Sequence, residues 1–241
     1  MRVLGLNSFQ LKIIAIILMV LDHLYKFIPQ MPLIFTWLGR LVAPIFFFFV
    51  VEGFFYTSNK GRYLTRLLVW SGIMFIGTNI IVYVFPSDTQ LGYNIFLSLS
   101  MAVILMMIFE WIKIQERLST KSIGVLLALI IAIISLFTEA SIIGVIMTTI
   151  FYYFRGRKFL ISMSYIALSA ALLIPVIFNP QGMDILSLDG FYSQWLMVFA
   201  LPFLFLYNGQ RGPNGPIAKY MFYFFYPFHL WIIYLVSNFY T

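Results

Sequence analysis

The sequence predicts an all-α fold, a polytopic membrane bundle of about nine transmembrane helices, from three observations. The 241 residues are 62% hydrophobic and 10% charged, with a mean hydropathy of +0.97, which is outside the range of soluble globular proteins. Apolar runs of about 20 residues, the length that crosses a bilayer, recur along the whole chain. Basic residues gather between these runs in an alternating pattern. We therefore expect a multi-pass protein with a single transmembrane domain over residues 1–241.

The apolar runs give the predicted spans in chain order. The first run contains Asp22 and His23, is too long for a signal peptide and is followed by no small-residue cleavage site, so we expect it to be a mature helix. The fifth and sixth runs are short and share a junction at Thr138-Glu139-Ala140. They could therefore be two full crossings of the membrane, or half-helices that form a re-entrant pair. The nine predicted spans are residues 8–29, 33–57, 64–85, 93–112, 122–138, 139–154, 159–179, 193–208 and 217–240.

Lys and Arg predict the orientation, because they are enriched in cytoplasmic loops. The even-numbered loops are basic and carry Lys60, Arg62, Arg66, Lys113, Arg117, Lys121, Arg155, Arg157, Lys158, Arg211 and Lys219. The odd-numbered loops carry Asp88, Glu139, Asp184 and Asp189, with Lys26 as an exception. We therefore expect the N-terminus in the cytoplasm and the C-terminus outside.

Composition also excludes several kinds of chemistry. The chain has no cysteine, so disulfides, thiolate metal sites and an acyl-cysteine intermediate are excluded. With two histidines and eight acidic residues, we expect no metal site. The formal charge of +7 is explained by membrane topology and anionic lipid, so we expect no nucleic-acid partner. A bacterial plasma membrane fits this pattern best.

The two histidines, His23 and His229, both lie inside predicted spans, where an ionisable group is costly and marks a candidate functional site. With about 1.5 Å of rise per residue, His23 lies about 20 Å and His229 about 18 Å from the cytoplasmic side. Arg40 lies about 10 Å below the outer surface, and Glu139 falls in the outer half as well. These groups, with Asp22, therefore share one layer of the predicted bundle.

This layer suits acid–base chemistry. Histidine serves as a general base near neutral pH, and Asp22 or Glu139 would orient an imidazole or balance its charge. Arg40 would stabilise a developing oxyanion or hold an anionic group. Two structural interpretations stay open: His229 as a hydrogen-bonded packing residue, and Arg40 with Asp22 as an ion pair that joins the first two spans.

On the predicted cytoplasmic side, the segment from Glu52 to Arg66 is a compact basic loop with aromatic residues. Its cations Lys60, Arg62 and Arg66 suit the phosphates of a cytosolic cofactor, although they also fit a topological role. The Gly-rich segment 208–216 matches no nucleotide-binding fingerprint and is expected to be a flexible connection.

Several segments together resemble the TraX family of bacterial membrane proteins, which takes its name from the conjugative pilin acetylase. They are Leu6-Asn7-Ser8-Phe9-Gln10-Leu11-Lys12, Asp22-His23, Leu38-Gly39-Arg40-Leu41-Val42-Ala43-Pro44-Ile45-Phe46, Val51-Glu52-Gly53-Phe54-Phe55-Tyr56-Thr57 and Lys219-Tyr220-Met221-Phe222-Tyr223-Phe224-Phe225-Tyr226-Pro227-Phe228-His229-Leu230. The family is similar to membrane acyltransferases of the acyltransferase-3 kind. The chain departs from relatives in Gly72 through Ile81, which lacks an acidic pair.

The resemblance implies transfer of an acyl group, in the first instance acetyl, from cytosolic acyl-CoA to an acceptor at the outer half of the membrane. Asp22, His23, Arg40, Glu52 and His229 fit the family pattern. The acceptor would be an amine or hydroxyl of a cell-envelope polymer, lipid or protein. Two alternatives are a transporter or flippase that uses the layer as a proton relay or substrate clamp, and a noncatalytic assembly factor. The acceptor, the acyl chain length and the oligomeric state stay open.

Overall fold

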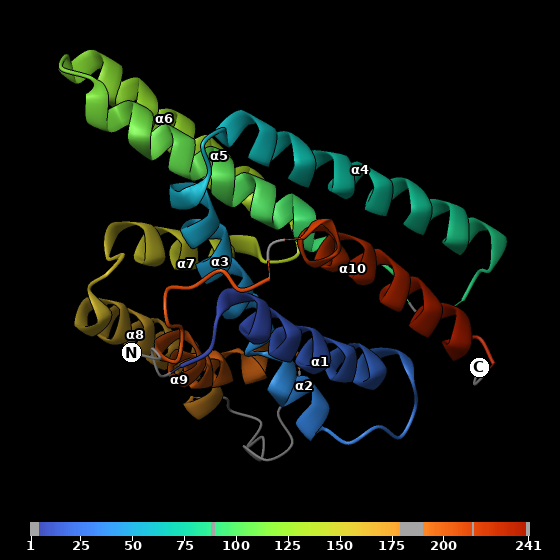
Figure 1. The fold of residues 1–241 in the computed structure, drawn as a ribbon. Helices are drawn as coiled ribbons and strands as arrows, with labels where there is room; N and C mark the ends of the chain where they lie inside the picture. Colours follow the sequence, from blue (N-terminus) through green and yellow to red (C-terminus); the bar gives the residue numbers. More distant parts are fainter. Residues whose placement is uncertain (1–4, 88–89, 179–189, 214, 240–241) are drawn as a thin grey trace. The chain divides into compact units, whose positions relative to one another are not determined.

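The computed structural model describes residues 5–87, 90–178, 190–213 and 215–239, and helices dominate these ranges (Figure 1). The described residues form no β-strand, and Leu6 and Tyr207 make one isolated bridge. The predicted all-α fold is confirmed. Asp88, Asp184 and Asp189, used above to orient the chain, lie outside the described residues.

The chain divides into two compact units, which are taken separately below. Unit 1 comprises residues 1–46, 81–90 and 156–241, and unit 2 comprises residues 47–80 and 91–155. The helices of unit 1 are α1 (Ser8–Phe27), α2 (Ile34–Gly39), α8 (Lys158–Ile177), the 3-10 helix η2 (Gly190–Ala200), α9 (Leu201–Phe205) and α10 (Pro216–Ser237). Unit 2 holds α5 (Ile95–Ile114), α6 (Leu118–Ser135), α7 (Ser141–Tyr153) and most of α3 (Val42–Tyr56) and α4 (Lys60–Val84).

Seven helical segments among the described residues are long and apolar enough to cross a membrane. They are Ser8–Phe27, Ile34–Tyr56, Lys60–Val84, Ile95–Ile114, Leu118–Ser135, Lys158–Ile177 and Tyr220–Ser237. The predicted spans 139–154 and 193–208 correspond to the shorter apolar helices Ser141–Tyr153 and Tyr192–Phe205. The protein is thus a multi-pass membrane protein. The total of nine crossings and the orientation of the termini stay predictions.

The start of α1 is fixed by a capping box and by a distant loop. Asn7 accepts a hydrogen bond from the Gln10 backbone N–H at 2.9 Å, and the Gln10 side chain accepts one from the Asn7 N–H at 3.0 Å. The backbone of Leu6 pairs with residues 206 and 208, and Ser8 N–H donates to Gln210 O. The Gly-rich segment was predicted to be a flexible connection. These bonds attach its first residues to the start of α1, and the flexibility of the segment stays a prediction.

Between α2 and α3 the helix breaks at Arg40, for a reason visible in the sequence. Pro44 has no backbone N–H, so it cannot donate the helical hydrogen bond to the carbonyl of Arg40, four residues earlier. Its ring would also clash with that carbonyl in a regular helix. Gly39, the last residue of α2, lies directly against Asp22 of α1: a Cβ built at Gly39 would lie 2.4 Å from Asp22 Cβ. The break and the missing side chain together bring α2 close to α1, which it packs against in unit 1 (Figure 1).

The last helix, α10, also packs against α1 and carries a proline inside it (Figure 1). Pro227 removes one backbone donor and loosens the carbonyl ladder in the turn before His229. In unit 2, α5 packs against α6 and α7. Gly124 of α6 allows the close contact, since a Cβ there would lie 2.4 Å from Ile112 Cγ1 of α5.

Candidate functional site

The two histidines meet within unit 1. His23 Nδ1 lies 2.8 Å from His229 Nε2, and the ring centroids are 5.0 Å apart. Both side chains are buried, with 3% and 8% of their surfaces exposed. The prediction that the first and last helices bring them into one layer is consistent with this contact. A hydrogen bond between two imidazoles also means that each ring restricts the protonation of the other.

A neighbouring backbone carbonyl assigns the protons on this pair. His229 Nδ1 lies 2.8 Å from Phe225 O, and because a carbonyl oxygen only accepts, Nδ1 must carry the proton. In neutral His229 the lone pair is then on Nε2, which must accept from His23 Nδ1–H. His23 is therefore protonated on Nδ1, and its lone pair, the basic position, is on Nε2.

Asp22 is engaged on both oxygens. Its Oδ2 is paired with Lys26 Nζ at 2.6 Å, one turn further along α1, and its Oδ1 accepts from Thr36 Oγ1 of α2 at 3.0 Å. Thr36 is fully buried and Asp22 is 8% exposed. The carboxylate thus connects α1 to α2. Its oxygens contact Lys26 and Thr36, whereas the Nδ1 of His23 is oriented by His229.

Arg40 reaches this network through a hydroxyl. Its Nη2 donates to Thr36 Oγ1 at 2.8 Å, so Thr36 stands between the guanidinium and Asp22. The sequence left open a direct ion pair between Asp22 and Arg40. In the structure the Thr36 hydroxyl instead bridges the two side chains. The Nε of Arg40 is buried and has no hydrogen-bond partner among the described residues. The Arg40 guanidinium is therefore an oriented cation with one unused hydrogen-bond donor, a combination that suits binding of an anionic group or an oxyanion.

We predict that Thr36→Val lowers the free energy of unfolding by about 1–3 kcal/mol, because valine fills the same space but leaves Arg40 Nη2 and Asp22 Oδ1 each without this partner. Denaturant unfolding in detergent measures the change. Thr36→Ser keeps the hydroxyl and is expected to lose less than half as much. Equal stability of the valine variant and the wild type would contradict the assigned role of this hydroxyl.

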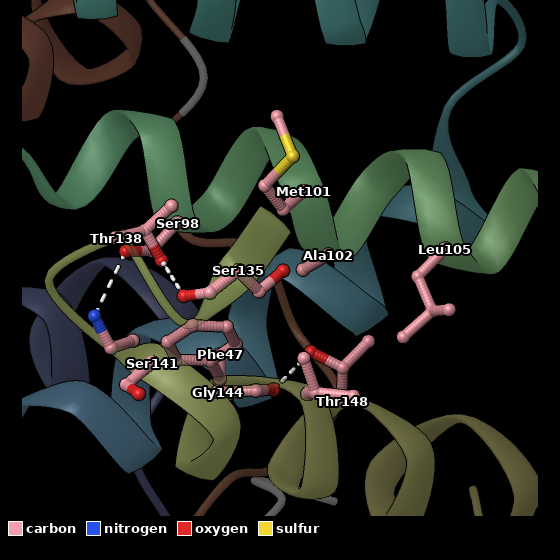
Figure 2. A pocket seen from close by; sticks show the side chains of 12 residues that line it. Phe47, Ser98, Met101, Ala102, Leu105, Ser135, Thr138, Ser141, Gly144 and Thr148 are labelled. Atoms are coloured by element: carbon pink, nitrogen blue, oxygen red, sulfur yellow. Dashed lines mark hydrogen bonds between the residues drawn. The ribbon is translucent and has the colours of Figure 1, made fainter. Parts of the chain in front are cut away.

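Glu139 lies in unit 2, in the turn between α6 and α7, where it is exposed. Its place beside the histidines stays a prediction. A pocket of about 200 Å³ adjoins this turn (Figure 2). Figure 2 shows the lining hydroxyls turned to nearby groups: Thr148 Oγ1 donates to Gly144 O, and Ser98 Oγ accepts from the Ala140 N–H. None of the described residues that line the pocket has a titratable side chain, so these residues do not supply acid–base chemistry.

The predicted cofactor residues Glu52, Lys60, Arg62 and Arg66 all belong to unit 2, and two of them are in ion pairs. Lys60 is paired with Glu110. Arg62 is exposed, and the Arg66 guanidinium lies 5.7 Å from the centre of the Tyr63 ring. The remaining predicted residue, Glu52, is buried and therefore suits a structural contact better than a direct contact with a phosphate.

Glu52 binds the guanidinium of Arg155 in a forked arrangement. Arg155 Nε donates to Oε1 at 2.7 Å and Nη2 donates to Oε2 at 3.1 Å. The hydrogen bond that Arg155 donates to Glu52 raises the pKa of Arg155 above its usual value, so the guanidinium stays charged. The cation also lies 4.5 Å from the Phe55 ring centre. This contact joins α3 to the end of α7.

We predict that Arg155→Ala lowers the free energy of unfolding by about 1–2 kcal/mol, because Glu52 stays buried without the guanidinium, while solvent screens part of the pair. Arg157→Ala is the matched control, since Arg157 is exposed and its side chain does not cap α8. Thermal unfolding in detergent compares the two. A control that loses as much stability as Arg155→Ala would contradict the role given to the pair.

Among the residues that hold the site together, sequence reasoning missed Thr36, Lys26 and Gly39. The spacing of four between Asp22 and Lys26 is a recognisable helical pair and was a usable signal. A buried threonine or a glycine at a helix contact has no such pattern. Among the described residues, no group of three or more potential metal ligands gathers.

Comparison with known proteins places the chain in a family. The family described as TraX protein matches residues 8–237, nearly the whole sequence. A curated relative, named probable fimbrial assembly protein FimC of serogroup H1 from Dichelobacter nodosus, is 43% identical over 76 residues. That match covers 30% of this chain and 31% of the relative, so less than a third of either protein is aligned. No solved structure matches the chain.

Proposed function

This chain belongs to the TraX family, and from that premise we propose that it is an integral membrane acyltransferase. The family match confirms the resemblance predicted from the sequence, and the family is associated with pilin acetylation. The wider relation to acyltransferase-3 enzymes stays a prediction. The single observation that carries the proposal is the buried His23–His229 pair, with the lone pair of His23 on Nε2, beside the network that orients Arg40.

In the proposed reaction, His23 Nε2 is the general base. It takes the proton from an acceptor hydroxyl or amine as the oxygen or nitrogen attacks the carbonyl carbon of an acyl thioester. The carbon–sulfur bond then breaks and the departing thiolate recovers the proton. The chain has no cysteine, which excludes an acyl-cysteine intermediate, and direct transfer to the acceptor needs fewer steps than a route through an acyl-histidine.

Arg40 stabilises the oxyanion that forms during this attack. Its guanidinium is always charged, Thr36 fixes one of its nitrogens, and its buried Nε–H makes no hydrogen bond with the described residues. His229 was the other residue considered for this role. Both of its ring nitrogens are engaged, one with Phe225 O and the other with His23, so Arg40 is the better candidate.

The donor is proposed to be a cytosolic acyl-CoA, and acetyl-CoA is the first to test. Its phosphates would contact exposed cations near the start of α4, where Arg62 is the most accessible of the predicted residues. Glu52 supports this region through Arg155, and Lys60 does so through Glu110. For the acceptor, the match to a protein named for fimbrial assembly favours an amine or hydroxyl of a pilus subunit as the first class to test.

The proposal is tested with purified protein in lipid vesicles, radiolabelled acetyl-CoA, and a cell-envelope extract of the same bacterium with and without its pilus proteins. We expect label to pass to a component of the extract. Failure with every extract, together with no hydrolysis of acetyl-CoA, would reject the acyltransferase. Movement of a substrate across the vesicle membrane without acetyl-CoA would instead favour the transporter. If the protein neither transferred acetyl groups nor moved a substrate, a noncatalytic assembly role would be favoured.

A further inference from the structure

The geometry of the histidine pair points to a role for His229 that the acyltransferase proposal does not contain. We propose that His229 is a proton-relay residue: when His23 Nε2 takes a proton from the acceptor, the proton on His23 Nδ1 passes to His229 Nε2, so that the positive charge rests on His229. This inference rests on the proposed function, because it concerns the proton that acyl transfer releases.

The hydrogen bonds give the relay its direction. Phe225 O accepts from His229 Nδ1–H, and His229 Nε2 accepts from His23 Nδ1–H, so the lone pair of neutral His23 is on Nε2. One proton entering at His23 Nε2 moves one proton across the 2.8 Å contact. His229 then carries a proton on both nitrogens and keeps both hydrogen bonds, now as donor in each. No bond of the chain is lost by the transfer.

The surroundings favour the charge on His229 over His23. Lys26 lies three residues after His23 on the same helix. It is paired with Asp22 at 2.6 Å, and Asp22 also accepts a hydrogen bond from Thr36. Because the cation and the carboxylate balance each other, this ion pair leaves no net negative charge on α1 to hold a proton on His23.

On α10, by contrast, His229 faces groups that stabilise a cation. Its ring N–H at Nδ1 donates to the carbonyl of Phe225 at 2.8 Å. The Phe225 ring is stacked on the imidazole, with centroids 5.0 Å apart and an interplanar angle of 12°, so a π face covers the charge.

The relay returns the proton in the second half of the reaction. As the carbon–sulfur bond breaks, the thiolate takes the proton from His23 Nε2, and the proton on His229 Nε2 moves back to His23 Nδ1. The sum is an acceptor X–H and an acyl thioester giving the acylated acceptor and a thiol, with both histidines restored. No oxidant, metal or further reactant is required.

A test on the wild-type protein needs no acyl transfer. With ¹⁵N-labelled histidine in lipid, solid-state NMR is expected to show His229 protonated on Nδ1 and His23 on Nδ1 in the neutral pair, and one added proton appearing on His229 Nε2. An added proton that stays on His23, with His229 neutral, would overturn the relay. This readout stands even if the protein transfers no acyl group, so the two proposals fail separately.

A kinetic test separates relay from orientation. His229→Gln keeps an oxygen that accepts from His23 Nδ1–H but takes up no proton, so kcat is expected to fall about tenfold or more at unchanged KM for acetyl-CoA. We also expect the rate measured in mixtures of H₂O and D₂O to show that two protons move in the wild-type reaction. In the His229→Gln variant the same measurement is expected to show that one proton moves. A wild-type kcat in His229→Gln would reject the relay while leaving His23 as the base.

Discussion

Replacing His23 by alanine is expected to abolish acyl transfer, with a loss of about 10²–10⁴-fold in kcat, because the variant has no group at the Nε2 position to take the acceptor proton. The assay is transfer of label from acetyl-CoA in lipid vesicles. The side chain is 3% exposed, so the cavity left by alanine also weakens packing, and the folded fraction must be measured by thermal unfolding beside the rate.

The matched control for this variant is Asn79→Ala. Asn79 is also a polar residue inside a span, but it is exposed and its amide donates to Phe75 O of its own helix at 2.7 Å. We expect its turnover to be within about twofold of the wild type, as for surface substitutions away from a site. Unchanged turnover in His23→Ala at equal folded fraction would reject His23 as the base and, with it, the mechanism proposed here.

Gly39→Ala is expected to produce the second large effect, a loss of about 1–3 kcal/mol in the free energy of unfolding together with most of the activity. A Cβ at this position would lie 2.4 Å from both Cβ and Cγ of Asp22, so α2 must move away from α1. That displacement would stretch the hydrogen bonds of Thr36 to Asp22 and to Arg40. Chemical unfolding in detergent and the acetyl-transfer assay measure the two losses.

Gly72→Ala is the control, because the same substitution in α4 meets no atom within 4 Å. Alanine in the interior of that helix is expected to leave activity unchanged and to raise stability by about 0.5–1 kcal/mol. If Gly39→Ala behaved like Gly72→Ala, the close contact of α1 and α2 would not be needed for the site.

The hydrophobic pattern was enough to predict the helices, because a span must satisfy its backbone internally and be apolar along its length. It did not predict how the eighth predicted span is built. Residues 193–208 fall on η2, a 3-10 helix, followed by the short α9. A 3-10 helix of 11 residues is uncommon. This helix packs against α8, and a hydropathy average over neighbouring residues carries no information about that tertiary contact.

The site was predictable to the extent that its residues are rare in membrane spans. His23, His229, Arg40 and Asp22 stand out in an apolar sequence, and depth along each helix placed them in one layer. Their partners were not predictable in the same way. Which imidazole nitrogen faces which depends on helix rotation, and a single threonine decides whether Arg40 touches Asp22 directly, so these details needed the fold.

The pairing of the histidines also has a consequence for how the protein is made. His23 and His229 are 206 residues apart in sequence, on the first and last helices of unit 1. During synthesis, α1 leaves the ribosome and enters the bilayer long before α10 is made. Until then, His23 lacks its contact with His229. Because the partner lies on α10, the candidate site forms only after that helix has been synthesised. A ribosome-bound chain that lacks α10 should therefore be inserted but inactive, and adding the helix as a separate peptide is a direct way to restore it.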